Sequence, residues 1–365
     1  MKKYNCIFPG LYNYILTKDV GMIPYILAKY YNCTITTYNN DNYTYIDTIL
    51  KNNNLKINYL NNTKNEKKDV MEYIKKNAKN IDIIQFYHLR YNVLPWYVLI
   101  YKLYNPHGKI YLKLDANNDY IDFLVKRKGI LPMIRRFLVK ILFKFINVIS
   151  IETRRNYNTL KTSNIISPKK LLYLPNGIMK NNTNINNKEK IILYVGYIEK
   201  KNKSIDMLLQ VITTINLEEW RLVLIGRVMD DMKEFINNLF ENKPELKDKI
   251  ILKGYISDKN LLSQEYAKSS IYCCTSKKES FGISTLEAAY HGNYIISTNV
   301  GGSPDIINKT SYGKIINHDT NDLKETLEYT INNWNKLKRN PSKIQKIVYD
   351  NFNWNDLCDK LVKKF

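Results

Sequence analysis

Residues 279–287 read Glu-Ser-Phe-Gly-Ile-Ser-Thr-Leu-Glu and place two glutamates, Glu279 and Glu287, around a glycine-containing turn. The apolar run at 271–274 is typical of a buried strand, and residues 286–290 favour a helix. In the order strand, glycine turn, helix, the backbone N–H groups at the helix start can receive a phosphate. The stretch therefore predicts an anion-binding turn, with Glu279 in the loop above the strand and Glu287 in the first turn of the helix.

A simpler interpretation accounts for part of this stretch. Ser284 followed three residues later by Glu287 matches a capping box, in which both side chains bond the first N–H groups of a helix. This alternative explains Glu287, but it leaves Glu279, Phe281 and Gly282 without a reason. It also leaves the next segment unexplained, where an apolar strand at 294–298 leads into Val-Gly-Gly-Ser-Pro-Asp at 300–305.

Glu-x7-Glu around Ser-Phe-Gly, followed by Gly-Gly-x-Pro-Asp, resembles the donor-site signature of glycosyltransferase family 4. The resemblance implies the α/β GT-B fold: two doubly wound, Rossmann-like domains with parallel sheets that face a central cleft. It also implies a retaining hexosyltransferase that moves a hexose-type sugar from a nucleotide diphosphate sugar to a hydroxyl. The expected acceptor is a glycan or a lipid-linked oligosaccharide in surface polysaccharide synthesis.

The charge of the chain is unevenly distributed. Its 365 residues are enough for two domains, and the formal net charge is +22. Residues 1–178 hold 28 Lys and Arg against 11 Asp and Glu, whereas residues 179–365 hold 28 against 23. A basic first half implies an anionic partner, and we expect a membrane surface or a phosphorylated substrate. Nucleic acid is not expected, because no binding module is recognisable.

Cysteine usage and hydropathy argue for a cytoplasmic protein, with peripheral attachment to a membrane as an option. The five cysteines have no metal-ligand spacing and indicate free thiols. No run of 18 apolar residues suggests a transmembrane helix, and the first ten residues lack the apolar segment of a signal peptide. No metal or cofactor is expected apart from the nucleotide sugar as co-substrate.

The first half reads as an opening βαβ unit, with strands at 4–8 and 33–38 and a helix at 23–31. Gly21 precedes this helix; the resemblance makes it a donor-site glycine, and the alternative is a glycine that only opens the helix. His88 ends a strand at 81–88 and resembles the family histidine near the reaction centre, where it would orient the acceptor hydroxyl. A histidine packed at a loop mouth is the alternative. Asp115 ends a further strand and could bind the acceptor or cap the next helix.

A basic amphipathic segment at 131–149 carries Arg136, Lys140 and Lys144 at intervals of four residues, with apolar residues between them. One interpretation is a membrane-surface helix whose cations reach lipid headgroups. The other is a core helix with a solvated stripe. Both interpretations fit the sequence equally well.

A polar stretch at 179–190 predicts the domain boundary. The predicted domains are 1–178, which would bind the acceptor; 179–343, which would bind the nucleotide sugar; and a helical tail at 344–365 that crosses back to the first. Strands ending in Gly196 and Gly226 begin the second domain.

The resemblance assigns donor-site roles within the second domain. Gly196 and Lys203 would lie at the diphosphate, but Tyr197 occupies the position of the usual arginine, and Lys200, Lys201 or Arg227 would have to replace that cation. Tyr255 and Ile256 would lie beside the base. The phosphate turn would comprise Ser280, Phe281, Gly282, Ile283 and Ser284.

The two glutamates have the expected chemistry. A carboxylate can accept two hydrogen bonds from a ribose diol, which suits Glu287. Glu279 would bind a sugar hydroxyl or face the anomeric centre, and front-face substitution is the family expectation. Three alternatives remain: a GT-B epimerase or phosphorylase, a basic nucleic-acid-binding protein, and a membrane-bound scaffold without turnover, suggested by Tyr197.

Overall fold

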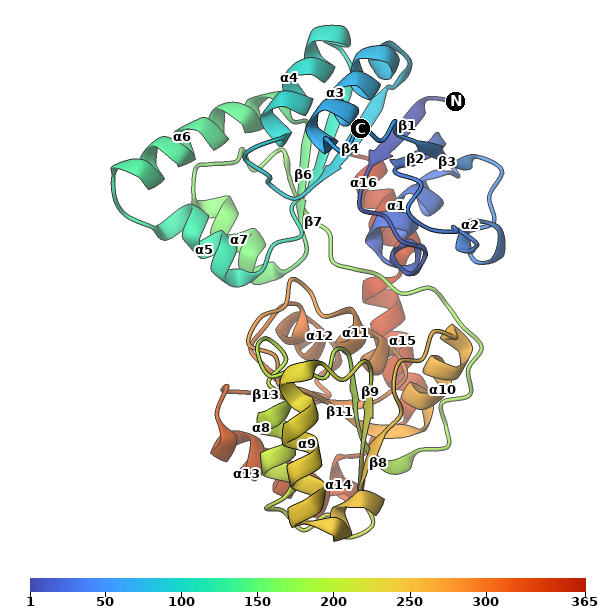
Figure 1. Cartoon of the computed structure of the whole chain (residues 1–365), viewed down its shortest axis with the longest axis vertical. Coiled ribbons are helices and arrows are strands. Elements are labelled where there is room, and N and C mark those ends of the chain that lie inside the picture. Colours follow the sequence, from blue (N-terminus) through green and yellow to red (C-terminus); the bar gives the residue numbers. More distant parts are fainter. The chain divides into compact units, whose positions relative to one another are not determined.

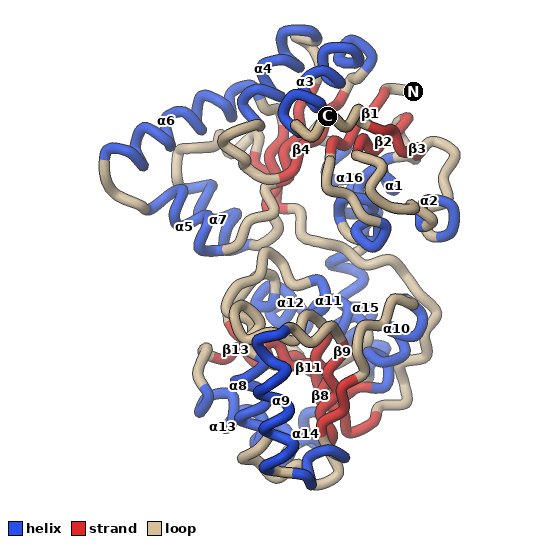
Figure 2. Tube along the Cα trace, viewed as in Figure 1, coloured by secondary structure: helices blue, strands red, loops and turns tan.

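The computed structural model describes all residues, 1–365, and divides them into two compact units (Figure 1). The first unit comprises Met1–Gly177 and Trp354–Phe365, and the second comprises Ile178–Asn353. Each unit is a parallel sheet with helices on its faces (Figure 2). The predicted α/β class, with two doubly wound parallel sheets, is confirmed.

The first unit has seven strands in the order β3-β2-β1-β4-β5-β6-β7, all paired in parallel. Its strands are β1 (Lys3–Ile7), β2 (Asn32–Thr37), β3 (Leu55–Tyr59), β4 (Ile83–Tyr87), β5 (Lys109–Lys113), β6 (Val148–Ile151) and β7 (Leu171–Tyr173). Its helices are η1 (Asn13–Thr17), α1 (Asp19–Leu27), α2 (Tyr45–Thr48), α3 (Glu66–Asn77), η2 (Ala78–Asn80), α4 (Leu94–Tyr104), α5 (Asn118–Lys126), α6 (Ile130–Phe145), α7 (Arg154–Thr162) and α16 (Trp354–Val362).

The second unit has six parallel strands in the order β10-β9-β8-β11-β12-β13. Its strands are β8 (Glu189–Val195), β9 (Arg221–Ile225), β10 (Ile250–Leu252), β11 (Ser269–Cys274), β12 (Tyr294–Thr298) and β13 (Gly313–Ile316). Its helices are α8 (Ile205–Ile212), α9 (Asp230–Asn242), η3 (Pro244–Asp248), α10 (Lys259–Lys268), α11 (Ile283–Tyr290), α12 (Ser303–Thr310), α13 (Thr320–Asn332), α14 (Trp334–Leu337) and α15 (Pro341–Phe352).

The strand orders fix where ligands can bind. In each sheet the order reverses once, between β1 and β4 in the first unit and between β8 and β11 in the second. In open parallel sheets, ligands bind outside the carboxyl ends of the strands at this switch point, because the connections leave the sheet on opposite faces there. We therefore expect the ligand-binding residues in the loops after these four strands.

The predicted tail at 344–365 is divided between the units. Helix α15 begins at Pro341, where the Asn340 side chain accepts hydrogen bonds from the N–H groups of Ser342 and Lys343, and it belongs to the second unit. Helix α16 follows after Asn353 and buries Trp354 and three further side chains, Leu357, Cys358 and Leu361, in the core of the first unit.

The polar stretch expected to be a linker is anchored along the second unit. The Lys188 ammonium donates hydrogen bonds to the backbone carbonyls of Ser269 and His291, at 2.8 and 2.6 Å, and to the Asn293 side chain at 3.1 Å. Asn181 and Thr183 bond Ser263 at 3.0 and 2.9 Å. These hydrogen bonds satisfy buried polar groups. The hydrophobic pattern of the sequence could not have predicted them.

Two glycines allow the loops after β8 and β9 to meet. Gly226 has φ +149°, and a Cβ atom there would lie 1.8 Å from the carbonyl oxygen of Gly196. Gly226 N–H also donates to the Gly254 carbonyl at 2.8 Å, which joins the loop after β10 to the same edge. Only a residue without a side chain fits this approach.

We predict that Gly226→Ala lowers the free energy of unfolding of the second unit by about 3 kcal/mol or more, because strain at positive φ adds to a clash with backbone. Gly10→Ala is the matched control, since nothing lies within 4 Å of its Cβ position. Urea titration of both variants measures the difference. Equal stability of the two variants would contradict this account of the β8–β9 edge.

Candidate functional site

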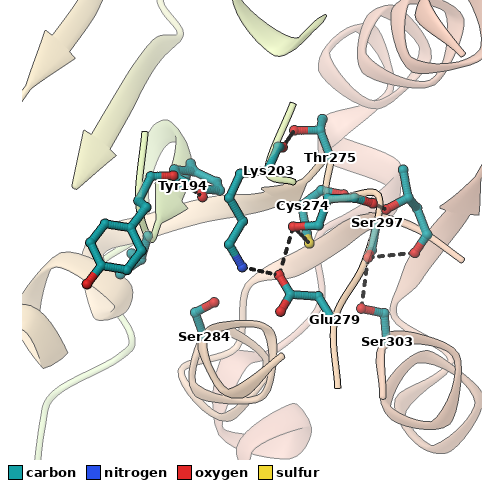
Figure 3. Close-up of polar contacts among 12 residues, drawn as sticks. Tyr194, Lys203, Cys274, Thr275, Glu279, Ser284, Ser297 and Ser303 are labelled. Atoms are coloured by element: carbon teal, nitrogen blue, oxygen red, sulfur yellow. Dashed lines mark hydrogen bonds and ion pairs between the residues drawn. The ribbon is translucent and has the colours of Figure 1, made fainter. Parts of the chain in front are cut away.

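The switch point of the second unit is joined by an ion pair between its two loops. Lys203, after β8, places its ammonium 2.5 Å from the Glu279 carboxylate, after β11 (Figure 3). The same carboxylate oxygen accepts a hydrogen bond from the Ser276 hydroxyl at 2.8 Å. Both charged side chains are about one-fifth exposed, so a ligand in solution can reach them.

Electrostatics keep Lys203 charged. Burial by itself would lower the pKa of the ammonium group, but the charge of Glu279 and its hydrogen bond outweigh burial and raise the pKa above its ordinary value. Lys203 thus remains a cation at neutral pH. It directly precedes Ser204, the residue before helix α8, where a positive charge opposes the helix dipole. The pair with Glu279 offsets that cost.

Backbone contacts fix the loops that carry this pair. Thr275 donates its hydroxyl to the carbonyls of Lys203 and Ser204, at 2.8 and 3.1 Å. The Lys277 N–H donates to the Asn202 carbonyl at 2.7 Å. The two loops are therefore hydrogen-bonded over several residues, and Lys203 and Glu279 are held in register.

The Gly-Gly pair at 301–302 supports the Glu279 loop from the other side. A Cβ atom on Gly302 would lie 2.3 Å from the Phe281 ring, and one on Gly301 would lie 2.4 Å from the Phe281 carbonyl oxygen. Gly302 N–H donates to that carbonyl at 2.6 Å, and Phe281 is buried. Phe281 and the two glycines thus position the loop, whereas Glu279 and its partner Lys203 carry the charges of the site.

The capping-box interpretation is wrong. Helix α11 begins at Ile283, its N-cap is Gly282 with φ +89°, and no side chain caps it. The Ser284 hydroxyl instead accepts a hydrogen bond from Tyr272 on β11 at 2.8 Å. Glycine tolerates left-handed backbone, so the helix starts earlier than the sequence pattern suggested. The first N–H groups of α11 belong to Ile283 and Ser284, next to Glu279.

Glu287 consequently lies in the second turn of α11, and the expectation of a first-turn position is wrong. Its carboxylate accepts a hydrogen bond from the Tyr266 hydroxyl on α10 at 3.1 Å and is half-buried. Sequence reasoning missed both tyrosines, Tyr266 and Tyr272. No local signal could have found them, because they reach α11 from other elements.

A neutral histidine fixes the end of α11. Burial lowers the pKa of His291 to about 4. Its Nδ1–H donates to the Glu287 carbonyl at 2.7 Å, so Nε2 is an acceptor and the Ser263 hydroxyl donates to it at 2.6 Å. The ring also stacks on Tyr266. The residues around Glu287 are therefore held from both sides of the helix.

The remaining donor-site candidates lie along the same sheet edge. Tyr197 is 56% exposed after β8, and Arg227 is exposed after β9. The Arg227 carbonyl accepts a hydrogen bond from Ile198 N–H at 3.0 Å, so these loops run side by side. Tyr255 is 68% exposed in the turn after β10, and Ile256 is half-buried. Lys200 lies 3.9 Å from Asp206.

In the first unit, His88 lies in the loop after β4, whereas Gly21 lies within helix α1. His88 follows β4 with φ +60°, and its Nδ1 is 3.7 Å from the Asp115 carboxylate. Gly21 lies inside α1, where a Cβ atom would be 2.0 Å from the Leu16 carbonyl oxygen. Packing therefore accounts for this glycine. The cap of α5 is Asn117, which accepts from Tyr120 N–H, so the capping interpretation of Asp115 is wrong.

No group of three potential metal ligands occurs in the structure. No helix is both long enough and apolar enough to cross a bilayer.

Two doubly wound α/β units, each with a single reversal of strand order, define a protein of the GT-B fold. The lipopolysaccharide outer core galactosyltransferase WaaB superposes over 100% of both chains with a TM-score of 0.74 at 15% identity. HepE of Anabaena, solved with UDP and glucose, superposes over 100% of this chain and 99% of its own with a TM-score of 0.70 at 13% identity. At these identities the likeness shows the fold.

The second unit resembles a known family in sequence. Residues 176–346 match the model of the family described as glycosyl transferases group 1. This match covers most of the second unit, which is therefore similar to members of this family. A 41.2 kDa protein of the cps region of Klebsiella pneumoniae is 31% identical over 164 residues, which cover 44% of this chain and 43% of that protein. The chain therefore spans less than half the length of this curated relative.

We predict that His291 makes the second unit acid-sensitive. The unfolded state binds a proton near pH 6.5 and the folded state only near pH 4, so stability is lost as pH falls through this window. The expected loss between pH 7 and pH 5 is about 2 kcal/mol. Urea titrations at both pH values measure it, and His291→Gln should remove most of it. An equal acid loss in that variant would assign the effect to other groups.

Proposed function

We propose that the protein is a retaining glycosyltransferase that moves a hexose-type sugar from a nucleotide diphosphate sugar to a hydroxyl group. The observation that carries this proposal is the Lys203–Glu279 pair at the switch point, beside the N-terminus of α11. The second unit, which holds these groups, is the part that matches the glycosyl transferases group 1 family.

The diphosphate would be bound by Lys203 and by the first N–H groups of α11. A helix N-terminus offers unpaired N–H donors and a partial positive charge, which suits a phosphate oxygen. The ion pair with Glu279 keeps Lys203 charged in the free protein, and a phosphate can share its donors. We assign the role of the arginine missing at Tyr197 to Arg227, which is exposed and whose backbone bonds Ile198 in the neighbouring loop.

The nucleoside and the sugar would lie on either side of the diphosphate. Glu287, held by Tyr266, would accept hydrogen bonds from the ribose diol. The exposed ring of Tyr255 and the backbone at Ile256 would adjoin the base. Glu279, oriented by Ser276 and Lys203, would accept a hydrogen bond from a sugar hydroxyl next to the anomeric carbon.

We propose front-face substitution as the reaction at this site. The bond between the anomeric carbon and the diphosphate oxygen breaks, and the bond between that carbon and the acceptor oxygen forms on the same face. The acceptor proton passes to the departing diphosphate. Lys203 and the N–H groups of α11 stabilise the charge that develops on the diphosphate, which supplies much of the rate enhancement.

The acceptor we propose is a glycan or a lipid-linked oligosaccharide in the synthesis of a surface polysaccharide. Support comes from relatives: one lies in a cps region, and WaaB is a galactosyltransferase of the lipopolysaccharide outer core. HepE was solved with UDP and glucose, which favours a uridine nucleotide as the donor.

Glu287→Ala should abolish stabilisation by the donor nucleotide. Wild-type protein at 100 times the dissociation constant of a bound UDP-, GDP- or ADP-sugar gains roughly 2.7 kcal/mol, measured as a thermal shift. Because Glu287 does not cap α11, we expect the variant without ligand to remain folded. Glu325→Ala, an exposed glutamate on α13, is the control. An unchanged shift in Glu287→Ala would refute the ribose contact.

We further propose that helix α6 docks the first unit on an anionic membrane surface. Only Val139, Leu142 and Phe143 of this helix are buried. Eight of its large apolar side chains are exposed, from 37% to 80%: Ile130, Leu131, Met133, Ile134, Phe137, Leu138, Ile141 and Phe145. A core helix with a solvated stripe would bury these residues, so the exposure favours the membrane interpretation.

Charge and neighbouring elements favour anionic lipid as the partner. The exposed Lys140 and Lys144 lie on α6 itself, and three cations, at 126–128, immediately precede it. The neighbouring α4 adds exposed Trp96, Leu99 and Leu103. An interfacial helix combines such an apolar face with basic residues that contact headgroups. In Figure 1, α6 runs along the outer side of the first unit.

Co-sedimentation with vesicles tests this surface. We expect the protein to bind vesicles of phosphatidylcholine and phosphatidylglycerol and to bind pure phosphatidylcholine weakly. Lys140→Gln with Lys144→Gln should weaken binding at least tenfold, since each cation near the surface contributes about 1 kcal/mol. The matched control is Lys75→Gln with Lys76→Gln on α3. Identical binding by both double variants would exclude α6 as the docking element.

A further inference from the structure

A short, strongly basic loop joins helices α5 and α6. The chain there reads Lys126-Arg127-Lys128-Gly129, and Gly129, with φ +118°, is the residue before α6. The first turn of α6 contains no acidic residue that would offset these cations. Figure 1 shows this loop at the outer end of both helices. The loop therefore presents a concentration of positive charge to solvent.

Two guanidinium groups at this loop share one aromatic ring. The guanidinium carbons of Arg127 and Arg135 lie 4.8 and 5.4 Å from the centre of the Phe123 ring, which is half-buried on α5. Arg135 also lies 5.1 Å from the centre of the Tyr91 ring, in the loop after β4. An aromatic face attracts a guanidinium and leaves its N–H groups available to an oxygen acceptor. Sharing one ring keeps both arginines within reach of a single anion.

Neither of these arginines has an acidic partner. On α5, the Asp122 carboxylate pairs instead with Lys126 at 2.9 Å and with Arg155 at 2.5 Å. The guanidinium groups of Arg127 and Arg135 form no ion pair and donate no hydrogen bond within the protein, and both side chains are exposed. Like charges that are held together repel each other. An anion that contacts both groups would remove this repulsion.

The next residue, Arg136, holds the loop in place. Its guanidinium donates hydrogen bonds to the backbone carbonyls of Arg127 and Val125, at 2.6 and 3.4 Å. These bonds tie the loop to the second turn of α6, on which Arg135 also lies. Arg127 is therefore fixed near Arg135 before any ligand arrives. Such preorganisation lowers the entropic cost of binding.

We propose that Arg127 and Arg135 form a binding site for one phosphomonoester group. This group carries three acceptor oxygens and close to two negative charges, which match two planar cations that each donate a pair of hydrogen bonds. A phosphodiester has only two unesterified oxygens and a single charge. The site therefore prefers the monoester.

The phosphate comes either from a lipid headgroup beside the exposed apolar face of α6 or from a soluble compound. For a lipid, the inference rests on the proposed docking of α6 on a membrane. It adds to that docking the recognition of one headgroup chemistry, which general attraction between charges does not provide.

Calorimetric titration of the full chain with glycerol 3-phosphate, with UDP present to fill the donor site, measures the site without a membrane. We expect one molecule to bind per chain. Arg127→Lys with Arg135→Lys keeps the charge but replaces planar paired donors by point charges, and should weaken binding roughly tenfold. Arg221→Lys, an exposed arginine on β9, is the control for this exchange.

A third variant tests the shared ring. Phe123→Leu keeps both arginines and removes the aromatic face, so it should also weaken binding of glycerol 3-phosphate. Because Phe123 is half-buried, its thermal unfolding is compared with that of the wild type. The double lysine variant carries the test if Phe123→Leu is unstable.

Vesicles distinguish the lipid from the soluble source. They consist of phosphatidylcholine with either phosphatidic acid, a monoester, or phosphatidylglycerol, a diester, in fractions that give equal surface potential. We expect wild-type protein to bind the phosphatidic acid vesicles several times more tightly. The double lysine variant should bind both kinds of vesicle as the wild type binds phosphatidylglycerol. Preference for phosphatidic acid without binding of glycerol 3-phosphate assigns the site to lipid, and binding of both assigns it to the phosphate alone.

The outcomes separate this site from the proposed docking of α6. Equal binding to both kinds of vesicle, together with no binding of glycerol 3-phosphate, would overturn the phosphate site and leave the docking intact. Wild-type behaviour of the double lysine variant in both assays would also overturn it. Failure to bind any anionic vesicle would overturn the docking, and the titration would then decide the site by itself.

Discussion

The ion pair between Lys203 and Glu279 is the interaction on which the organisation of the second unit depends. It joins the loops after β8 and β11, the two strands between which the strand order of the sheet reverses. Removing one partner would leave the other charge partly buried and uncompensated, which is costly. The same pair presents a cation and a carboxylate beside the N-terminus of α11. One contact therefore holds the loops in register and provides the charges that the proposed donor needs.

Close backbone approach makes this interaction possible. Gly226 against Gly196, and Gly301 and Gly302 against Phe281, bring loops closer than any side chain would allow. Gly282 starts α11 with left-handed backbone. Gly301, Gly302 and Gly282 in this way determine where Glu279 and the start of α11 lie. Protein interiors are densely packed, so a single added methyl group at such a position displaces the loop.

The two units share one topology but differ in the charged groups at their switch points. The second unit offers Lys203, a helix N-terminus and the exposed Arg227, which suit an anion. The first unit instead buries the Lys113 ammonium against the carboxyl groups of Glu152 and Asp19, at 2.6 and 3.5 Å, so its central cation is paired. Its many cations lie instead on the surface, several of them on α6 and just before it. The overall basic charge of this unit therefore lies on its surface and not at its switch point.

The sequence by itself determined the fold class and the order of the elements, because hydrophobic periodicity and glycine positions act over a few residues. It also placed Lys203 and Glu279 in loops after predicted strands and Glu287 in the helix that follows, although one turn too early. The capping box at Ser284 was wrong, because the backbone of Gly282 and the hydroxyl of Tyr272 decided the start of α11. No local pattern carries such a contact.

Only the tertiary structure decided which side chains meet. The partner of Glu287 is Tyr266 on another helix, and the partner of His88 is Asp115 on the neighbouring strand. The sequence pattern of α6 is compatible with a buried and with an exposed apolar face. Only the packing in the folded structure showed that this face is exposed. Strand order and helix packing set these contacts, and both depend on residues far apart in the chain.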